Sequence, residues 1–385
     1  MLKGKFPVAR FEKMRTPFYF YDMPLLRRTL MTIQQCTSSN PDYYVHYAIK
    51  ANNNPLILKE IAASGMGADC VSGGEIQAAL SAGFPANKIV YAGVGKSDEE
   101  IRLALSVGIS RFNVESSAEL EVISDIALSM GKVAPISLRI NPDIGAHTHA
   151  NITTGLAENK FGINYEQLDS VLELSDKLAG VEYKGLHFHI GSQILDMMDF
   201  VALCNRINAL VEKFAFKGRE LGDINVGGGL GINYHHPNHL DVADFASYFS
   251  TFSKHLKLPR ATKVHFELGR SVVAPCGTLI SRVLYVKEGT TKKFAIIDAS
   301  MTELIRPAMY KAYHRVENIS SYEPEEVYDV VGPVCESSDV FIKGASIDKC
   351  HRGDFIAIRS AGAYGESMAS QYNCRPLPES FIFNE

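Results

Sequence analysis

The sequence predicts an α/β protein in which a (β/α)8 TIM-like barrel carries an additional antiparallel β domain. Up to about residue 270, short β-branched and aromatic runs alternate with segments of helical period, which is typical of parallel βαβ units. Beyond that point the pattern has a period of two and lacks long helices. A chain of 385 residues also exceeds the size at which one hydrophobic core keeps growing. We therefore expect the barrel at residues 25–270 and the β domain at residues 1–24 together with 271–385.

The barrel prediction depends on eight strands of similar spacing. They cover residues 44–49, 68–72, 89–94, 112–116, 136–141, 185–190, 224–228 and 264–268. Several helical segments between them, such as PLILKEIAAS and SDEEIRLALSVG, begin with Pro, Ser or Asp, which favour the first turn of a helix. An open doubly wound sheet is the alternative. It does not need eight even units, and no G-x-G-x-x-G follows the first strand.

The β domain is predicted from runs such as TLISRVLYVKEG, KKFAIIDAS and DFIAIRSAGAY. The N-terminal FYFYD (18–22) is also strand-like and could pair with this domain. Asp22 is then placed to cap a helix that begins at Met23.

Bulk composition excludes several classes of function. The formal charge of -4 comes without a Lys/Arg stripe, which makes nucleic acid an unexpected partner. We find neither a signal peptide nor a membrane-length apolar run, so a cytoplasmic protein is expected. The seven cysteines form no C-x-x-C pair, which indicates reduced thiols rather than disulfides or zinc.

Polar residues at the C-terminal ends of the strands mark the expected active site, because barrel enzymes carry their chemistry there. These residues are Lys50, Asp69, Arg139, His187, His189, Gly227–Gly229, Glu267 and Arg270. Burial and neighbouring cations would make the Lys50 amine nucleophilic and able to form a Schiff base, although a lysine at a strand end can also simply reach solvent. The glycine run could hold a phosphate or be only a turn.

Glu267 and the H-x-H pair each allow two interpretations. A carboxylate against a pyridine nitrogen keeps that ring protonated and suits decarboxylation, but Glu267 could also pair locally with Arg270. His187 and His189 could bind zinc, or one imidazole could stack on a flat cofactor. Zinc needs three converging ligands, so we expect no metal site. The histidines His235, His236 and His239 are expected in a solvated loop.

Taken together, these residues resemble the fold-type III pyridoxal-phosphate-dependent decarboxylases, whose fold is like that of alanine racemase. The similarity is greatest to the branch that decarboxylates diaminopimelate, and it spans nearly the whole chain. The shared blocks are TPFYFYD, YAIKAN, GADCVSGGE, TGLAENKFGI, GLHFHIGSQ, INVGGGLG, ELGR, LIRPAMY, CESSD and GAYGESMASQYNCRP. Ten blocks in order make coincidence negligible.

The resemblance implies roles for individual residues. Lys50 would bind pyridoxal 5'-phosphate covalently, His189 would stack on its ring, and Glu267 would contact the pyridine nitrogen. The phosphate and the rest of the cofactor pocket would involve Ser192, Gly228, Gly229, Tyr364, Asp69, Arg139 and Arg270.

The resemblance also implies a homodimer with shared active sites. The CES segment of one subunit would complete the partner's pocket, and Cys335 would protonate the substrate carbon after carbon dioxide leaves. Without that resemblance, Cys335 would be interpreted as a buried thiol.

The substrate is predicted from charge. Arg270, Arg306 and Tyr310 would bind the distal carboxylate of meso-2,6-diaminopimelate, and Glu336 with Tyr364 would bind the distal amine. A decarboxylase acting on ornithine, lysine, arginine or carboxynorspermidine is the alternative, but a substrate with only a distal ammonium would leave Arg306 misplaced. A non-catalytic cofactor-binding homologue and a metal-dependent barrel hydrolase are further alternatives. The chain departs from the family at Leu268, where proline is usual, and at Ser338, where glycine is usual.

Overall fold

The computed structural model describes residues 6–142, 160–237 and 242–385, and the chain forms two compact units. One, here called the barrel unit, comprises Leu30–Gly231 and Asp244–Gly269. The other, here called the β unit, comprises Met1–Thr29, Ile232–Ala243 and Arg270–Glu385. The domain limits expected from the sequence, 25–270 and 1–24 with 271–385, stay a prediction.

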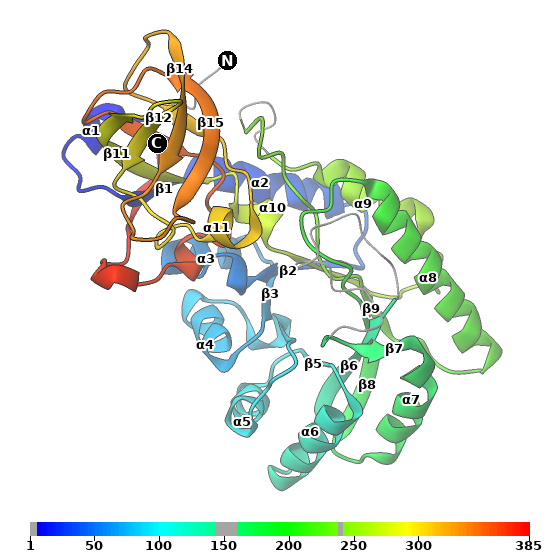
Figure 1. Cartoon of the computed structure of the whole chain (residues 1–385). Helices are drawn as coiled ribbons and strands as arrows, with labels where there is room; N and C mark the ends of the chain where they lie inside the picture. The colour runs from blue at the N-terminus through cyan, green and yellow to red at the C-terminus, as the bar shows by residue number, and fades with distance from the viewer. Residues whose placement is uncertain (1–5, 143–159, 238–241) are drawn as a thin grey trace. The chain divides into compact units, whose positions relative to one another are not determined.

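The barrel unit contains a closed parallel barrel, as predicted (Figure 1). Its strands are β2 (Tyr43–Ala48), β3 (Gly67–Cys70), β4 (Ile89–Tyr91), β5 (Arg111–Val114), β6 (Ala134–Asn141), β8 (Val181–His187), β9 (Asp223–Asn225) and β10 (Val264–Leu268). Each pairs in parallel with its neighbours, and pairing of β10 with β2 and of β5 with β6 closes the ring. The short β7 (Ile163–Asn164) adds to β6 from outside. All eight predicted strands are present.

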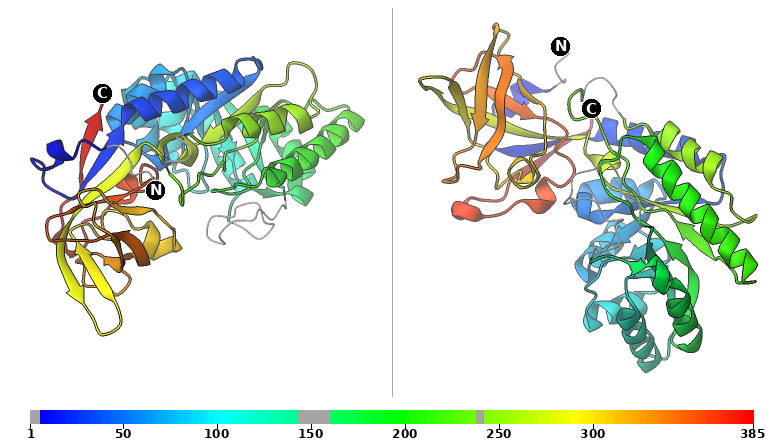
Figure 2. Two further views of the ribbon diagram at one scale, coloured as in Figure 1. Left: turned by 90° about the horizontal axis from the view of Figure 1, so that it is seen from above. Right: turned by 45° about the vertical axis from the view of Figure 1, so that its right-hand side comes forward.

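Helices precede or connect these strands, several of them where the sequence predicts helical segments. They are α2 (Met23–Thr37), α3 (Pro55–Ala63), α4 (Gly73–Ala82), α5 (Asp98–Val107), α6 (Ser117–Ser129), α7 (Leu168–Lys177), α8 (Met197–Phe216) and α9 (Phe245–His255). Ser97 and Glu100 form a capping box at the start of α5, which ends at Gly108 with φ +73°. Helices α8 and α9 lie side by side (Figures 1 and 2). No helix in the described ranges is long and apolar enough to cross a membrane.

The β unit is a mostly antiparallel sheet, which confirms the second part of the fold prediction. Its strands are β1 (Phe18–Asp22), β11 (Gly277–Glu288), β12 (Lys293–Ile297), β13 (Val316–Asn318), β14 (Glu325–Val331), β15 (Val340–Asp348), β16 (Phe355–Ile358) and β17 (Glu379–Phe383). The pairs β1–β17 and β12–β14 are parallel. Strand β1 pairs with β11, and Asp22 accepts a hydrogen bond from the Leu25 backbone N–H (2.8 Å) at the start of α2, both as predicted.

Short helices complete the chain. They are α1 (Val8–Phe11), α10 (Arg270–Val273), α11 (Arg306–Tyr310) and the 3-10 helices η1 (Ile49–Ala51), η2 (Ala86–Lys88), η4 (Tyr165–Gln167), η5 (Glu366–Met368) and η6 (Tyr372–Cys374).

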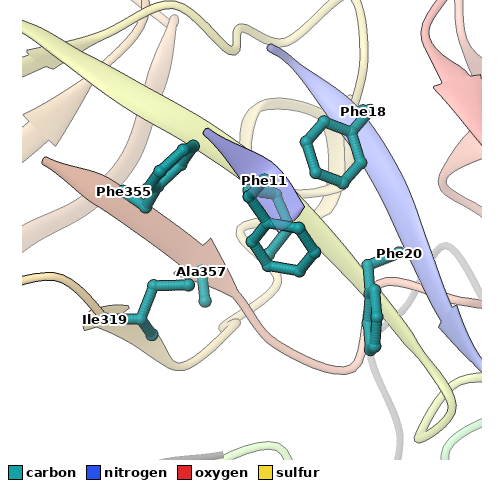
Figure 3. Close-up of a cluster of buried hydrophobic side chains, with 7 residues drawn as sticks. Phe11, Phe18, Phe20, Ile319, Phe355 and Ala357 are labelled. Carbon is teal, nitrogen blue, oxygen red and sulfur yellow. The ribbon is translucent and has the colours of Figure 1, made fainter. Parts of the chain in front are cut away.

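The N-terminal segment is held to the β unit by an aromatic core (Figure 3). Phe11 of α1 is fully buried, and its ring lies edge-on to Phe18, Phe20 and Phe355 at centroid distances of 5.2, 5.5 and 6.0 Å. Aromatic pairs in this geometry stabilise beyond their buried area. Phe11 and the short helix α1 are therefore part of the β unit's core.

Candidate active site

Lys50 lies in η1, directly after the first barrel strand, as the sequence predicts. Its side chain is 43% exposed, and its Nζ lies 3.5 Å from Oδ2 of the buried Asp69 at the end of β3. Burial raises the pKa of Asp69, the Glu267 carboxylate raises it further, and Lys50 partly offsets both effects. The second oxygen of Asp69 has no hydrogen-bond partner in the part of the chain that the structure describes. The site thus presents an accessible amine beside a carboxyl group with unused capacity.

Glu267 lies on β10 inside the barrel and is held by three donors. Its Oε1 accepts hydrogen bonds from the amide groups of Asn225 (2.7 Å) and Asn113 (3.2 Å), and its Oε2 lies 3.1 Å from His187 Nε2. Burial alone would raise the pKa of this carboxyl, but His187 and Lys50 outweigh it, and the pKa lies below its ordinary value. A carboxylate has roughly four lone-pair sites, so these donors leave about one for a further N–H.

The two histidines of the H-x-H pair have different surroundings. Strand β8 ends at His187, so His189 lies beyond it, and the prediction that both stand on one strand is wrong for His189. Burial, Arg139 and Lys50 hold the pKa of His189 well below its usual range, so its imidazole is neutral. Its Nδ1 faces the Gly228 N–H at 3.3 Å and accepts from it. Among described residues, no cluster of three or more His, Cys, Asp or Glu side chains could hold a metal ion.

Arg139 is fixed by Glu115, a residue that the sequence reading did not single out. Arg139 Nη1 donates to Glu115 Oε1 (2.7 Å), and the carboxylate also accepts from the backbone N–H groups of Gly93 (3.0 Å) and Gly162 (2.8 Å). Burial raises the pKa of the Glu115 carboxyl, but the charges of Arg139 and His187 outweigh burial. The pKa of Glu115 therefore lies below its ordinary value. Glu115 follows strand β5 directly, so its position at a strand end was the available signal.

The glycine run after β9 forms a tight turn beside the Ser192 loop. Gly227 and Gly229 have φ of +72° and +110°, and a Cβ on Gly228 would lie 1.8 Å from the Glu267 carbonyl oxygen. Only glycine fits such positions without displacement. Ile194 N donates to Gly229 O (2.9 Å), so the half-buried Ser192 and this turn belong to neighbouring segments. The glycines are therefore required because neighbouring backbone packs directly against the turn.

A second polar cluster lies in the β unit and contains predicted substrate ligands. Arg270 and Arg306, both 6% exposed, donate from Nη1 to the phenolic oxygen of Tyr234 at 2.8 and 3.0 Å. The Arg270 guanidinium lies 4.9 Å from the ring centroid of Tyr364, whose φ of +56° is rare for a residue with a side chain. Tyr310, also predicted, is half-buried and contributes to the electrostatic environment of Arg270. Sequence reasoning missed Tyr234.

Cys335 and Glu336 are both exposed in the β unit. The interpretation of Cys335 as a buried thiol is therefore wrong. Glu336 Oε1 accepts a hydrogen bond from the Tyr372 hydroxyl (2.7 Å), and the Cys335 N–H donates to Asn373 Oδ1 (3.3 Å). Ser338 is not among the described residues with positive φ, so serine causes no backbone strain there. Leu268 is fully buried as the last residue of β10.

The sequence also predicts three histidines in a solvated loop. His235 and His236 are exposed, as expected of a solvated loop, and the His235 ring stacks on Tyr313 at 4.0 Å. His239 and the start of the TGLAENKFGI block lie outside the described residues.

Comparisons with known proteins agree with this arrangement. Residues 26–274 match the family model of the pyridoxal-dependent decarboxylase, pyridoxal binding domain. The diaminopimelate decarboxylase of Bacteroides thetaiotaomicron is 61% identical over the whole of both chains. The structure of Helicobacter pylori diaminopimelate decarboxylase with L-lysine has a TM-score of 0.92 at 40% identity, covering 98% of this chain and 94% of that one. The M. jannaschii enzyme with L-lysine has a TM-score of 0.90 at 34% identity, covering 98% and 89%.

Proposed function

Because this chain belongs to the pyridoxal-dependent decarboxylases, and within them to the diaminopimelate decarboxylases, we infer that it converts meso-2,6-diaminopimelate to L-lysine and carbon dioxide. This reaction is the last step of lysine biosynthesis, and its cofactor is pyridoxal 5'-phosphate. The observation that carries the inference is the Glu267 carboxylate, kept ionised by three donors inside the barrel that also presents the Lys50 amine.

The residues of the barrel unit suit this cofactor. When bound, pyridoxal phosphate supplies an aldehyde and an electron-withdrawing ring that stabilises the carbon losing carbon dioxide. Lys50 would provide the amine that holds the aldehyde. The remaining lone pair of Glu267 would hold a proton at the ring nitrogen, and the neutral His189 would contact the ring.

The other barrel residues hold and orient the cofactor. Gly228, Gly229 and Ser192 bind the phosphate through backbone N–H and hydroxyl groups, since successive backbone N–H groups in a glycine-rich turn can form a concave anion site. Asp69 and Arg139 support the Lys50 side of the pocket, and Glu115 fixes Arg139. Arg270 and Tyr364 are further proposed contacts of the cofactor.

The β unit recognises the end of the substrate that does not react. Arg270, Arg306 and Tyr310 bind the distal carboxylate, because a buried carboxylate needs cationic donors. Glu336 and Tyr364 bind the distal amine. A substrate with only a distal ammonium would face two buried arginines, which disfavours ornithine and lysine.

The enzyme works as a homodimer in which the CES segment reaches the partner's active site. The exposure of Cys335 and Glu336 supports this arrangement, because both residues are accessible to another chain. Cys335 then delivers a proton to the carbon that has lost carbon dioxide. The protein's own partner is a second copy of this chain, with neither nucleic acid nor membrane required.

Product analysis tests the function directly. The purified protein is incubated with pyridoxal phosphate and, separately, with diaminopimelate, lysine, ornithine, arginine and carboxynorspermidine, and amine and gas products are measured. Diaminopimelate should be the preferred substrate. Release of carbon dioxide from another amino acid but not from diaminopimelate would refute the substrate assignment while leaving the chemistry intact.

Removing the attachment point separates an enzyme from a non-catalytic homologue. Lys50→Ala should abolish both turnover and the visible absorption of the attached cofactor, because no other amine replaces it. An active Lys50→Ala protein would show that the cofactor is attached elsewhere. Size determination in solution tests the dimer, and an active monomer would contradict the shared site.

A further inference from the structure

Tyr234 connects the two arginines of the β unit. We propose that Tyr234 is a positioning residue of the distal-carboxylate site, whose single phenolic oxygen holds Arg270 and Arg306 together and so selects ligands that carry a carboxylate at the distal end. This inference rests on the substrate proposed above. Its geometric basis is the pair of N–H···O contacts, 2.8 Å from Arg270 and 3.0 Å from Arg306, to a phenol that is only 7% exposed.

A phenol suits this position better than other side chains. Guanidinium groups only donate hydrogen bonds, and two of them repel each other when buried. Phenylalanine would give them no acceptor. A carboxylate would accept from both, but its full negative charge would compete with the carboxylate of the substrate. The phenolic oxygen accepts from both arginines and leaves most of their positive charge for the ligand.

His314 holds Arg306 from another direction without neutralising it. His314 Nδ1 donates to the Arg359 carbonyl (2.9 Å), so its Nε2 accepts from Arg306 Nη1 (2.8 Å). The imidazole lies edge-on to the Tyr234 ring at 5.0 Å. Among the residues that the structure describes, Arg306 has no carboxylate within ion-pair distance. Two neutral acceptors therefore orient a cation whose charge no described carboxylate balances.

The electrostatics of Tyr234 provide a signal that can be followed. Burial raises the pKa of this phenol, but the charges of Arg270 and Arg306 outweigh that effect and lower it below the ordinary value. Buried tyrosines elsewhere, such as Tyr19 and Tyr248, have raised pKa values. Tyr234 should thus ionise at a lower pH than these two residues.

Ligand affinity is the first test. L-Lysine keeps one carboxylate of diaminopimelate, whereas cadaverine has the same two amines and no carboxylate. In the cofactor-loaded enzyme, Tyr234→Phe should weaken L-lysine binding about tenfold, through loss of hydrogen bonds to charged groups, and leave cadaverine binding unchanged. It should raise KM for diaminopimelate by a similar factor with little change in kcat.

Tyr248→Phe is the matched control. This buried tyrosine of the barrel unit has a hydroxyl without a hydrogen-bond partner in the described part of the chain, so removing it should alter neither affinity. An unchanged L-lysine affinity in Tyr234→Phe, or equal weakening of both ligands, would overturn the proposal.

Ultraviolet titration is the second test, and it needs only the unmodified sequence if Tyr234→Phe does not fold. The chain has 17 tyrosines and no tryptophan, so the tyrosinate band appears without indole absorption. As the pH rises, part of the tyrosinate signal should move to higher pH with L-lysine, whose carboxylate offsets the guanidinium charge, and stay in place with cadaverine. A signal insensitive to L-lysine would overturn the positioning role.

The two inferences can fail separately. If the enzyme does not decarboxylate diaminopimelate but L-lysine still shifts the tyrosinate signal, the proposed function fails and the role of Tyr234 stands. If diaminopimelate is decarboxylated while Tyr234→Phe binds L-lysine normally, the reverse holds.

Discussion

In the barrel unit one buried carboxylate, Glu267, is surrounded by three donors, whereas in the β unit two buried guanidinium groups share the oxygen of Tyr234. The first cluster confines a negative charge with two amides and an imidazole, and it keeps about one lone pair unused. The second cluster holds two positive charges beside a phenol, which accepts one hydrogen bond from each guanidinium and leaves their other N–H groups for further acceptors.

The difference suits the two clusters to ligands of different chemistry. Unused acceptor capacity in the barrel suits a ring N–H, and surplus positive charge in the β unit suits a carboxylate. Burial makes both requirements strict, because an unpaired charge costs more inside a protein than at its surface.

The largest effect is expected from removing the charge of the barrel cluster. Glu267→Gln should lower kcat about 10² to 10³-fold, the range for loss of a preorganised electrostatic contact, while Lys50 still attaches the cofactor. Turnover and visible absorption measure the two effects. Glu303→Gln, which alters a buried carboxylate of the β unit, is the control and should retain activity. If Glu267→Gln were as active as the unchanged protein, the negative charge of Glu267 would have no role in catalysis.

A smaller effect is expected from loosening the same cluster. Asn225 donates to Glu267 (2.7 Å) and accepts from the Gly227 N–H (2.9 Å), which connects the carboxylate to the glycine turn. Asn225→Ala should lower the free energy of unfolding by about 1–3 kcal/mol, because both groups lose a buried partner. It should also weaken cofactor binding. Denaturant unfolding and cofactor titration would measure these changes, and normal values for both would show that the carboxylate needs no such support.

In the β unit, geometry can be separated from charge. Arg306→Lys keeps the positive charge but loses the planar fork that contacts Tyr234 and His314. KM for diaminopimelate should rise about tenfold, equivalent to loss of one charged hydrogen bond, with little change in kcat. Steady-state kinetics would detect this, and an unchanged KM would mean that charge alone suffices.

Acid should destabilise the two units in the same way, because each contains a buried histidine. Burial lowers the pKa of His46 in the barrel and of His314 in the β unit from 6.5 to about 3. Below pH 6.5 the unfolded chain therefore binds protons that the folded chain does not. Stability is complete above pH 6.5 and should fall toward pH 3 by about 1 kcal/mol per pH unit for each histidine.

Substitution of either histidine tests this pH dependence. His46→Gln or His314→Gln should flatten the curve of unfolding free energy against pH, measured by denaturant titration. A curve as steep as that of the unchanged protein would assign the acid sensitivity to other groups.

The sequence by itself determined the architecture and pointed to the candidate reacting groups. Strand and helix periods are local, so all eight barrel strands and the separate β sheet could be read from them. Lys50 and Glu267 stand at or near strand ends, and the topology of a barrel brings such positions to one mouth.

Only the tertiary structure decided which side chains support them. Tyr234 and His314 lie 80 residues apart in the chain and meet at Arg306, and Glu115 meets Arg139 from the neighbouring strand. No local pattern marks these residues, because their roles come from buried hydrogen bonds between distant segments. Hydrophobic periodicity reports which face of a strand is buried, whereas the pairing of donors and acceptors depends on coordinates.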